Sequence, residues 1–153
     1  MTDDRAQLID NIRIAIASAT DERDVLARAA ELIDAYSEHF DWTGFYMLKN
    51  GKLIVGPYVG PETPHKEIEL HQGVCGAAAS NRKTIIVDDV RKDERFLACS
   101  AFTRSEIVVP LMDGDTVLGE IDIDSNQPSF FTKDDREMLE RVAAVVVERL
   151  KQI

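Results

Sequence analysis

Two runs of alternating apolar and polar residues in the last third of the chain constrain the fold more than any other feature. The runs span residues 105–112 and 116–124, and Asp113-Gly114-Asp115 separates them. Alternation with a period of two is typical of strands that bury one face, and a short connection containing glycine joins antiparallel strands. The sequence therefore predicts a β-hairpin with a three-residue loop.

The apolar positions also predict how the two strands pair. Placing the apolar faces together sets Ile107 opposite Ile121 and Leu111 opposite Val117. A slip of one residue would turn apolar side chains to both faces, which a half-buried sheet resists.

The other face of the hairpin gathers three carboxylates. In this register Glu106 lies opposite Asp122, and Asp124 follows two residues further on. Alternating charge is commonly a solvated sheet face, but Val108 and Leu118 share this face and indicate that it is partly covered. Covered, crowded carboxylates need a cation or a shared proton, so a ligand ammonium or a metal would satisfy them. Without nearby histidine, a metal would be Ca²⁺ or Mg²⁺ rather than Zn²⁺.

The patterns elsewhere predict a single α+β domain with a mainly antiparallel sheet packed by helices. Helical spacing fills residues 1–38, strands and active-site loops fill 41–124, and a helix capped by Thr132 follows over 132–151. We expect loops over 56–64, which is rich in glycine and proline, and over 88–98, which is charged and aperiodic.

The charge of the chain disfavours several classes of partner. Lys and Arg number 18 against 28 Asp and Glu, a formal charge of −10. This excess opposes binding to a phosphate backbone or an anionic membrane, and no apolar run is long enough to span one. The polar N-terminus is unlike a signal peptide. We therefore expect a cytoplasmic protein with reduced thiols, and neither nucleic acid nor membrane as a partner.

The aromatic segment 42–46 predicts part of a binding site. Trp42, Gly44 and Tyr46 share one face of a strand, so two rings flank a residue without a side chain. The resulting slot would be about 13 Å wide. Aromatic walls suit a thioether, a methyl group or a cationic head, although plain core packing explains the same pattern.

The chain has two cysteines, and each is either a reactive thiol or a small buried apolar residue. Cys75 begins a predicted short helix over 73–80, where the helix N-terminus would lower the thiol pKa. Cys99 ends the charged loop, where a thiol is accessible. The helix argument favours Cys75 as nucleophile. The three histidines show no metal-ligand spacing, and we expect no metal centre.

Together these segments resemble the GAF-domain free methionine-(R)-sulfoxide reductases. The resemblance extends over nearly the whole chain in the same order, and the matching segments are Asp41-Trp42-Thr43-Gly44-Phe45-Tyr46, Gly73-Val74-Cys75-Gly76, Ala98-Cys99, Ser105-Glu106-Ile107-Val108-Val109-Pro110-Leu111 and Gly119-Glu120-Ile121-Asp122-Ile123-Asp124-Ser125. It implies a GAF fold, with a central antiparallel sheet between helices, and a homodimer.

The resemblance also implies roles for individual residues. It makes Cys99 the catalytic thiol, and it assigns substrate binding to Glu106, Asp122, Asp124 and the aromatic residues Trp42 and Tyr46. Many members carry a resolving cysteine ten residues before Cys75, where this chain has His65. Cys75 is then the candidate resolving thiol, and direct attack by an external thiol is the alternative.

The implied reaction reduces free L-methionine-(R)-S-oxide to L-methionine. The Cys99 thiolate attacks the sulfoxide sulfur, and a carboxyl group with a raised pKa protonates the oxygen. Glu106 is the first choice for this acid, and Asp124 is the second. The resulting sulfenic acid becomes a disulfide, which thioredoxin or another dithiol reduces without any bound cofactor. The rival interpretations are a non-catalytic GAF sensor of a small ligand and a Cys75/Cys99 redox switch.

Overall fold

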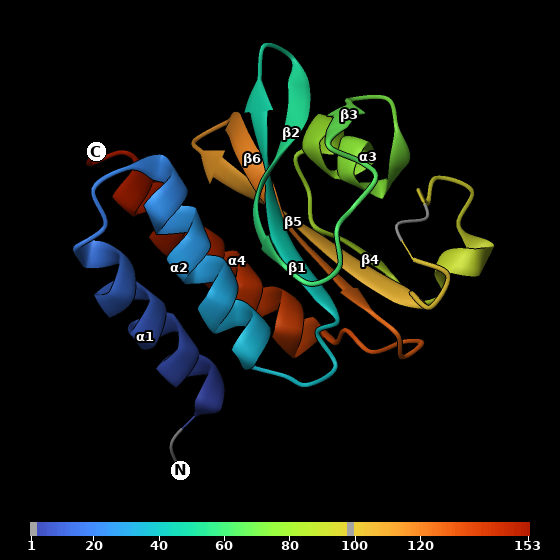
Figure 1. Ribbon diagram of the computed structural model, residues 1–153, viewed down its shortest axis with the longest axis horizontal. Coiled ribbons are helices and arrows are strands. Elements are labelled where there is room, and N and C mark those ends of the chain that lie inside the picture. The colour runs from blue at the N-terminus through green and yellow to red at the C-terminus, as the bar shows by residue number, and fades with distance from the viewer. Residues whose placement is uncertain (1–2, 98–99) are drawn as a thin grey trace.

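One six-stranded sheet organises the chain in the computed structural model, which describes residues 3–97 and 100–153 (Figure 1). The strand order is β3-β2-β1-β6-β5-β4, and every neighbouring pair is antiparallel. The strands are β1 (Trp42–Lys49), β2 (Lys52–Val59), β3 (Glu67–Glu69), β4 (Ile85–Val87), β5 (Ser105–Asp113) and β6 (Thr116–Ser125). The β5–β6 hairpin therefore lies inside the sheet, with both of its outer edges paired.

Helices pack on both faces of this sheet. One face carries α1 (Asp4–Ala17), α2 (Glu22–Ala35) and α4 (Lys133–Leu150), whereas α3 (Gly73–Asn81) lies on the other (Figure 1). A 3₁₀ turn, η1 (Val90–Lys92), interrupts the segment predicted as a charged loop. The arrangement confirms the predicted α+β class.

The two faces of the sheet have different interiors, because successive side chains of a strand point to opposite sides. Ile107, Ile121 and Ile123 pack with α1, α2 and α4 in the larger apolar core. Val108 and the aromatic residues of β1 pack with α3 in a smaller cluster. The larger core supplies most of the apolar burial, and the smaller one surrounds the candidate site.

The predicted register of the β5–β6 hairpin is wrong by two residues. Ile107 pairs with Ile123 rather than with Ile121, and Leu111 pairs with Gly119 rather than with Val117. The register shifts by one residue between Leu111 and Met112, where Leu118 of β6 is the extra residue of a β-bulge, and a two-residue turn replaces the predicted three-residue loop.

The bulge also reverses the faces of the sheet on which Val117 and Leu118 of β6 lie. Asp113 pairs with Thr116, so only Gly114 and Asp115 form the turn. Beyond the bulge Val117 packs with the α3 cluster and Leu118 with the larger core, opposite to the prediction. A shift of two residues leaves the rest of the hairpin facing as predicted, and Val108 covers the acidic face as expected.

The predicted loop over 56–64 is wrong in its first part, because β2 continues to Val59. Its register with β1 shifts between Val55 and Tyr58, and β3 pairs only with Lys52–Ile54. Gly56 and Pro57 therefore lie in an irregular part of β2 that is not in register with either neighbouring strand. Proline, which has no backbone N–H, is tolerated at such a place in a sheet.

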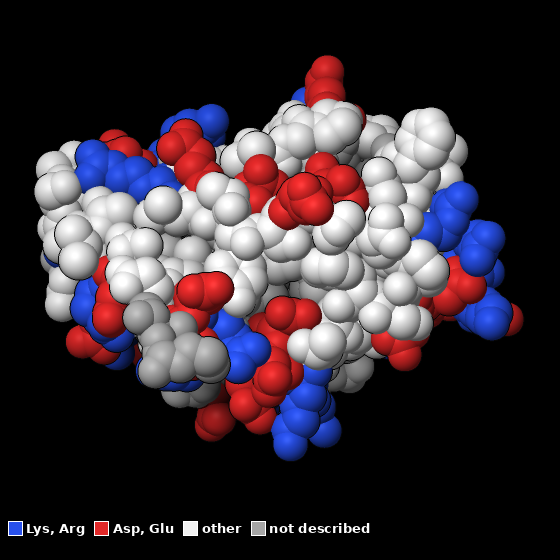
Figure 2. Space-filling view, turned by 90° about the horizontal axis from the view of Figure 1, so that it is seen from below, with Lys and Arg blue, Asp and Glu red and all other residues white. Residues whose placement is uncertain are grey.

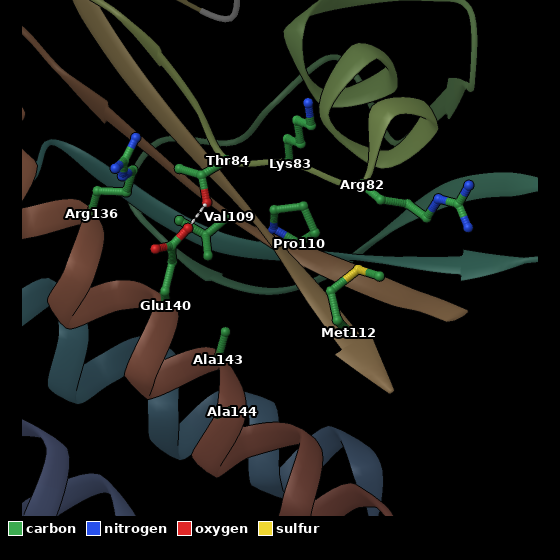
Figure 3. A pocket seen from close by; sticks show the side chains of 10 residues that line it. All are labelled: Arg82, Lys83, Thr84, Val109, Pro110, Met112, Arg136, Glu140, Ala143 and Ala144. Atoms are coloured by element: carbon green, nitrogen blue, oxygen red, sulfur yellow. Dashed lines mark hydrogen bonds between the residues drawn. The ribbon is translucent and has the colours of Figure 1, made fainter. Parts of the chain in front are cut away.

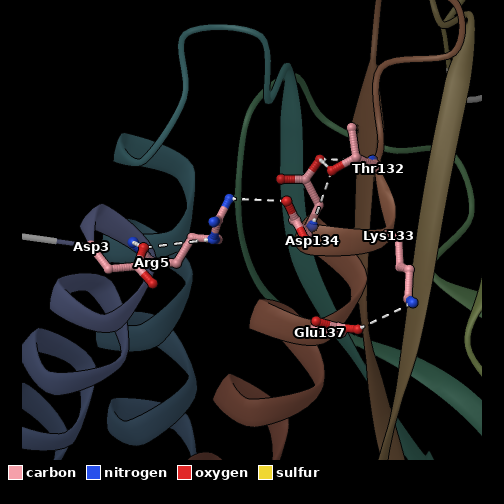
Figure 4. A network of polar contacts seen from close by, with 7 residues as sticks. Asp3, Arg5, Thr132, Lys133, Asp134 and Glu137 are labelled. Carbon is pink, nitrogen blue, oxygen red and sulfur yellow. Dashed lines mark hydrogen bonds and ion pairs between the residues drawn. The ribbon is translucent and has the colours of Figure 1, made fainter. Parts of the chain in front are cut away.

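The start of α4 confirms the predicted Thr132 cap. Thr132 and Asp135 form a reciprocal capping box, and Asp134 in the same turn forms an ion pair of 3.5 Å with Arg5 of α1 (Figure 4). Arg5 lies in the first turn of α1, and its backbone N–H donates a hydrogen bond to the side chain of the N-cap residue, Asp3. The ion pair between Arg5 and Asp134 links the N-terminal turns of α1 and α4.

Charged side chains of both signs are interspersed on the face that Figure 2 shows, with the basic groups separated by acidic ones. Within residues 3–97 and 100–153, no helix is long and apolar enough to cross a membrane.

The substitution Gly76→Ala tests how tightly α3 is seated on the sheet. An added Cβ would lie 2.7 Å from the Glu69 carbonyl oxygen and 2.9 Å from that of Leu70. Alanine inside a helix normally stabilises by about 1 kcal/mol over glycine. Here we expect a net loss of about 1–3 kcal/mol in the free energy of unfolding, measured by urea denaturation, because backbone must move.

The control for this change is Gly114→Ala in the hairpin turn. Nothing lies within 4 Å of its added Cβ, so only the positive φ of +59° remains as a cost, about 1 kcal/mol. A Gly76→Ala protein more stable than the wild type would show that α3 is not held against those carbonyl groups.

Candidate active site

Four carboxyl groups form one buried cluster on the α3 side of the sheet. Glu106 of β5 lies opposite Asp124 of β6, and Asp122 and Glu120 follow on the same face of β6. Their exposed fractions are 5% or less. The structure thus brings together the three predicted acids, although the cross-strand partner of Glu106 is Asp124 rather than Asp122. We call these four residues the carboxylate cluster.

The fourth member, Glu120, is absent from the predicted site. Its side chain is 0% exposed, and it lies opposite Tyr46 on one side and Pro110 on the other. The signal was available, since Glu120 has the same two-residue spacing as Asp122 and Asp124.

The cluster is poor in hydrogen-bond partners. Among the described residues, both oxygens of Glu120 and one oxygen each of Asp122 and Asp124 are buried without one. A buried carboxylate without partners is costly, so these groups retain protons or attract a cation. A positively charged group bound at this point would therefore stabilise the ionised carboxylates.

Burial is the largest cause that raises the pKa values of all four carboxyl groups. The charge of Asp122 adds to the increase at Glu106, Glu120 and Asp124. Hydrogen bonding toward Asp122 and Asp124 raises the pKa of Glu106 further, since it favours the protonated acid. The raised pKa favours the protonated form of the Glu106 carboxyl group.

Cys75 points into the cluster from the first turn of α3. Its Sγ donates a hydrogen bond of 3.5 Å to Oδ2 of Asp122, and the residue is 5% exposed. Burial raises the pKa of this thiol well above its ordinary value, and the charges of Asp122, Glu120 and Glu106 raise it further. The predicted lowering by the helix N-terminus is wrong, because desolvation and three like charges outweigh a partial helix charge.

The same geometry defines a set of potential metal ligands. One ligand atom each from Cys75, Glu106 and Asp122 lies within 4.8 Å of the others, and all three residues are buried. The family resemblance implies that Cys75 is a resolving thiol of the same site, but the hydrogen bond from its thiol to Asp122 follows only from the packing of α3 on the sheet.

Trp42 and Tyr46 share the face of the cluster, as predicted, because they lie opposite Asp124 and Glu120 in the β1–β6 pairing. The predicted open slot between them is wrong. Their rings stack with centroids 6.1 Å apart, and the Trp42 ring lies where a Cβ of Gly44 would be, at 2.6 Å. Gly44 thus makes room for the neighbouring indole rather than for a ligand.

Hydrogen bonds and a third ring fix these aromatic side chains. Trp42 Nε1 donates to the Pro61 carbonyl at 3.0 Å, and the Tyr46 hydroxyl donates to the His65 carbonyl at 2.8 Å. Tyr58 of β2, which the sequence did not single out, stacks on Trp42 with centroids 5.1 Å apart.

Two hollows adjoin the carboxylate cluster. The first is a cavity of about 10 Å³, room for about one water, whose lining includes Cys75, Asp122 and Leu97. The second is a pocket of about 110 Å³ whose lining includes Asp124 and Ser100. Leu97 and Ser100 are the described neighbours of residues 98–99. Cys99, the predicted nucleophile, lies outside the described residues.

A separate surface hollow of about 430 Å³ lies between α4 and the β4–β5 edge (Figure 3). Thr84 there donates a hydrogen bond of 2.7 Å to Glu140. Its lining contains neither cysteine nor any member of the carboxylate cluster, so it offers no comparable chemistry.

Comparison with known proteins gives concordant matches. A model of the GAF domain family matches residues 21–150. The free methionine-R-sulfoxide reductase of Saccharomyces cerevisiae is 40% identical over 129 residues, which cover 79% of this chain and 71% of that protein. The Escherichia coli protein of the same name is 31% identical over 139 residues, or 91% and 84% of the two chains.

Solved structures show the same likeness. The free methionine-R-sulfoxide reductase of Neisseria meningitidis, in complex with its substrate, superposes with a TM-score of 0.91 at 31% identity, covering 99% of this chain and 92% of that one. The type II enzyme of Thermoplasma acidophilum superposes with a TM-score of 0.82 at 35% identity, covering 86% and 93%.

The substitution Glu120→Met tests how much the buried carboxylate cluster lowers the free energy of unfolding. It removes two unpartnered oxygens while keeping a similar volume, so we expect a gain of about 1–3 kcal/mol in the free energy of unfolding at pH 7. A raised acid pKa favours the folded state most below the ordinary value of 4.5, and that contribution is lost as pH rises through the folded-state pKa. The gain should therefore grow from pH 4 to pH 8 in urea denaturation.

Glu94→Met, at an exposed position, is the matched control and should change stability little at any pH. If Glu120→Met and Glu94→Met gave the same pH dependence, Glu120 would carry no burial penalty.

Proposed function

The chain belongs to the GAF-domain free methionine-R-sulfoxide reductase family, and from this premise we propose that it reduces free methionine-(R)-sulfoxide to methionine with Cys99 as the attacking thiol. The observation that carries the proposal is the buried carboxylate cluster with its unpartnered oxygens. A free amino acid brings the ammonium group that such a cluster lacks, whereas a residue inside a peptide does not.

The cluster supports recognition of the substrate ammonium by Glu106, Asp122 and Asp124. All three are buried, and Asp122 and Asp124 each retain an oxygen without a partner. In water-poor surroundings a hydrogen bond between ammonium and carboxylate is short and strong. Trp42 and Tyr46 cover the same sheet face and would contact the methyl-sulfoxide end.

The contrast between the two thiols supports Cys99 as the nucleophile. Cys75 is buried, and like charges raise its pKa, so it is a poor first attacker. Leu97 and Ser100, on either side of residues 98–99, line the two hollows beside the cluster. The described residues next to positions 98–99 thus lie beside the carboxylate cluster.

In the proposed first step, the Cys99 sulfur attacks the substrate sulfur while Glu106 gives a proton to the sulfoxide oxygen. The oxygen then transfers to the Cys99 sulfur as the substrate sulfur–oxygen bond and the transient sulfur–sulfur bond both break, so methionine leaves and Cys99 becomes a sulfenic acid. The substrate is reduced by two electrons and Cys99 is oxidised by two. The raised pKa of Glu106 supports its role as the acid, and Asp124 is the second choice.

In the proposed second step, the Cys75 sulfur attacks the sulfenic acid, a disulfide forms and water leaves. Asp122, which already accepts a hydrogen bond from Cys75, can receive the thiol proton. Thioredoxin or another dithiol then reduces the disulfide, so that no bound cofactor is needed. Such reductants act in the cytoplasm, the location expected from the sequence, and the family resemblance implies a homodimer.

The size of the cavity beside Cys75 has a consequence for binding. About 10 Å³ accommodates one water, not an amino acid. The substrate can therefore reach the cavity beside Cys75 only if the side chains that line it move.

Two cysteine variants test the assignment. With free methionine-(R)-sulfoxide and dithiothreitol, Cys99→Ser should lose methionine production to background, because no thiol attacks the substrate. Cys75→Ser should retain turnover with dithiothreitol, which can reduce the sulfenic acid directly, and lose it with thioredoxin, which needs the disulfide that Cys75 is proposed to form. Methionine is measured by chromatography.

Each outcome discriminates between alternatives. Turnover that survives Cys99→Ser excludes Cys99 as the nucleophile. A wild-type protein that binds methionine sulfoxide without any turnover is a sensor, and one that neither binds nor converts it but forms the Cys75–Cys99 disulfide is a redox switch.

A further inference from the structure

The contact between Cys75 and the acids makes a set of ligands that differs from a purely acidic site. One donor atom each from Cys75, Glu106 and Asp122 lies within 4.8 Å of the other two. In a tetrahedral zinc site, donor atoms are roughly 3.3–3.8 Å apart. The three residues come from α3, β5 and β6, so modest movements of their side chains would bring the donors to that spacing.

Buried oxygens without hydrogen-bond partners lie at the same place, and they favour a bound cation independently of the spacing of the three donor atoms. Oδ1 of Asp122 is buried without a partner, and so are both oxygens of Glu120. Glu120 lies two residues before Asp122 on the same face of β6, and its side chain is fully buried there. It can supply a fourth ligand or a hydrogen bond to a ligand.

The space between these donors has the size of a single ion. The cavity lined by Cys75, Glu106 and Asp122 measures about 10 Å³. A cavity of that size admits one water or one bare cation. It excludes an amino acid until the surrounding side chains move.

We infer that Cys75, Glu106 and Asp122 form a binding site for a thiophilic divalent cation, with Zn²⁺ as the preferred ion. The thiol decides the choice of metal. Three carboxylates alone would favour Ca²⁺ or Mg²⁺, as the sequence suggested, but a sulfur donor selects Zn²⁺ over either of them. On binding, Cys75 releases its proton and the dication neutralises the carboxylates.

The bound ion would inhibit the enzyme rather than assist it, a consequence that rests on the proposed function. It would occupy the carboxylates proposed to hold the substrate ammonium, and it would engage the thiol proposed to resolve the sulfenic acid. Zinc would thus compete with substrate and protect Cys75 from oxidation.

Cobalt provides a direct probe, because a thiolate bound to Co²⁺ gives a charge-transfer absorption that oxygen ligands do not. We expect the reduced full-length protein to bind about one equivalent of Co²⁺ with this absorption, and Zn²⁺ to abolish it by displacement. Cys75→Ser should remove the absorption, whereas Cys99→Ser, which removes the other thiol of the chain, should retain it.

Two further variants test the oxygen ligands. Glu106→Gln and Asp122→Asn should each weaken Zn²⁺ binding by at least about tenfold in competition with a chromogenic chelator. Asp115→Asn, in the exposed hairpin turn, should leave the affinity unchanged. Thermal denaturation of every variant shows whether it is folded.

The outcomes separate this inference from the proposed function. Absence of the thiolate absorption in the wild type, or its persistence in Cys75→Ser, overturns the metal site even when the protein turns over substrate. A Cys75-dependent absorption in a protein without turnover supports the metal site and overturns only the proposed activity.

Discussion

The burial of four carboxyl groups on one face of a sheet is the constraint on which the rest of the structure depends. Like charges in a place with little water cannot all remain ionised, so the cluster must hold protons or attract a cation. Burial is the largest cause of the raised pKa values of Glu106 and Cys75, and the neighbouring carboxylates raise both further. A protonated acid, an inert resting thiol and an affinity for cations thus have one physical origin.

The two-sided sheet makes this arrangement tolerable. On one side, Ile107, Ile121 and Ile123 pack into a large apolar core with three helices, which supplies most of the hydrophobic stabilisation. On the other side the same strands present Glu106 and Asp122 beneath α3. Stability and chemistry are therefore divided between alternate residues of the same two strands.

The sequence predicts the facing of side chains better than their pairing. Alternation placed Glu106, Asp122 and Asp124 together correctly, since a two-residue shift of register leaves each side chain on its face. The β-bulge could not be predicted from the sequence, because it depends on backbone geometry at the end of the hairpin rather than on residue type. The contact with Cys75 depends on how α3 packs across the sheet, and no local pattern reports that. The ring of Trp42 over Gly44 is a rotamer, which sequence spacing does not determine.

The central claim is that the carboxylate cluster recognises the ammonium of a free amino acid. The most direct measurement compares kcat/KM for free methionine-(R)-sulfoxide with that for its N-acetyl derivative, which has the same sulfoxide and no ammonium. Because the buried carboxylates would be left without their partner, the account predicts a loss of at least about a hundredfold. Equal values for the two substrates would contradict it.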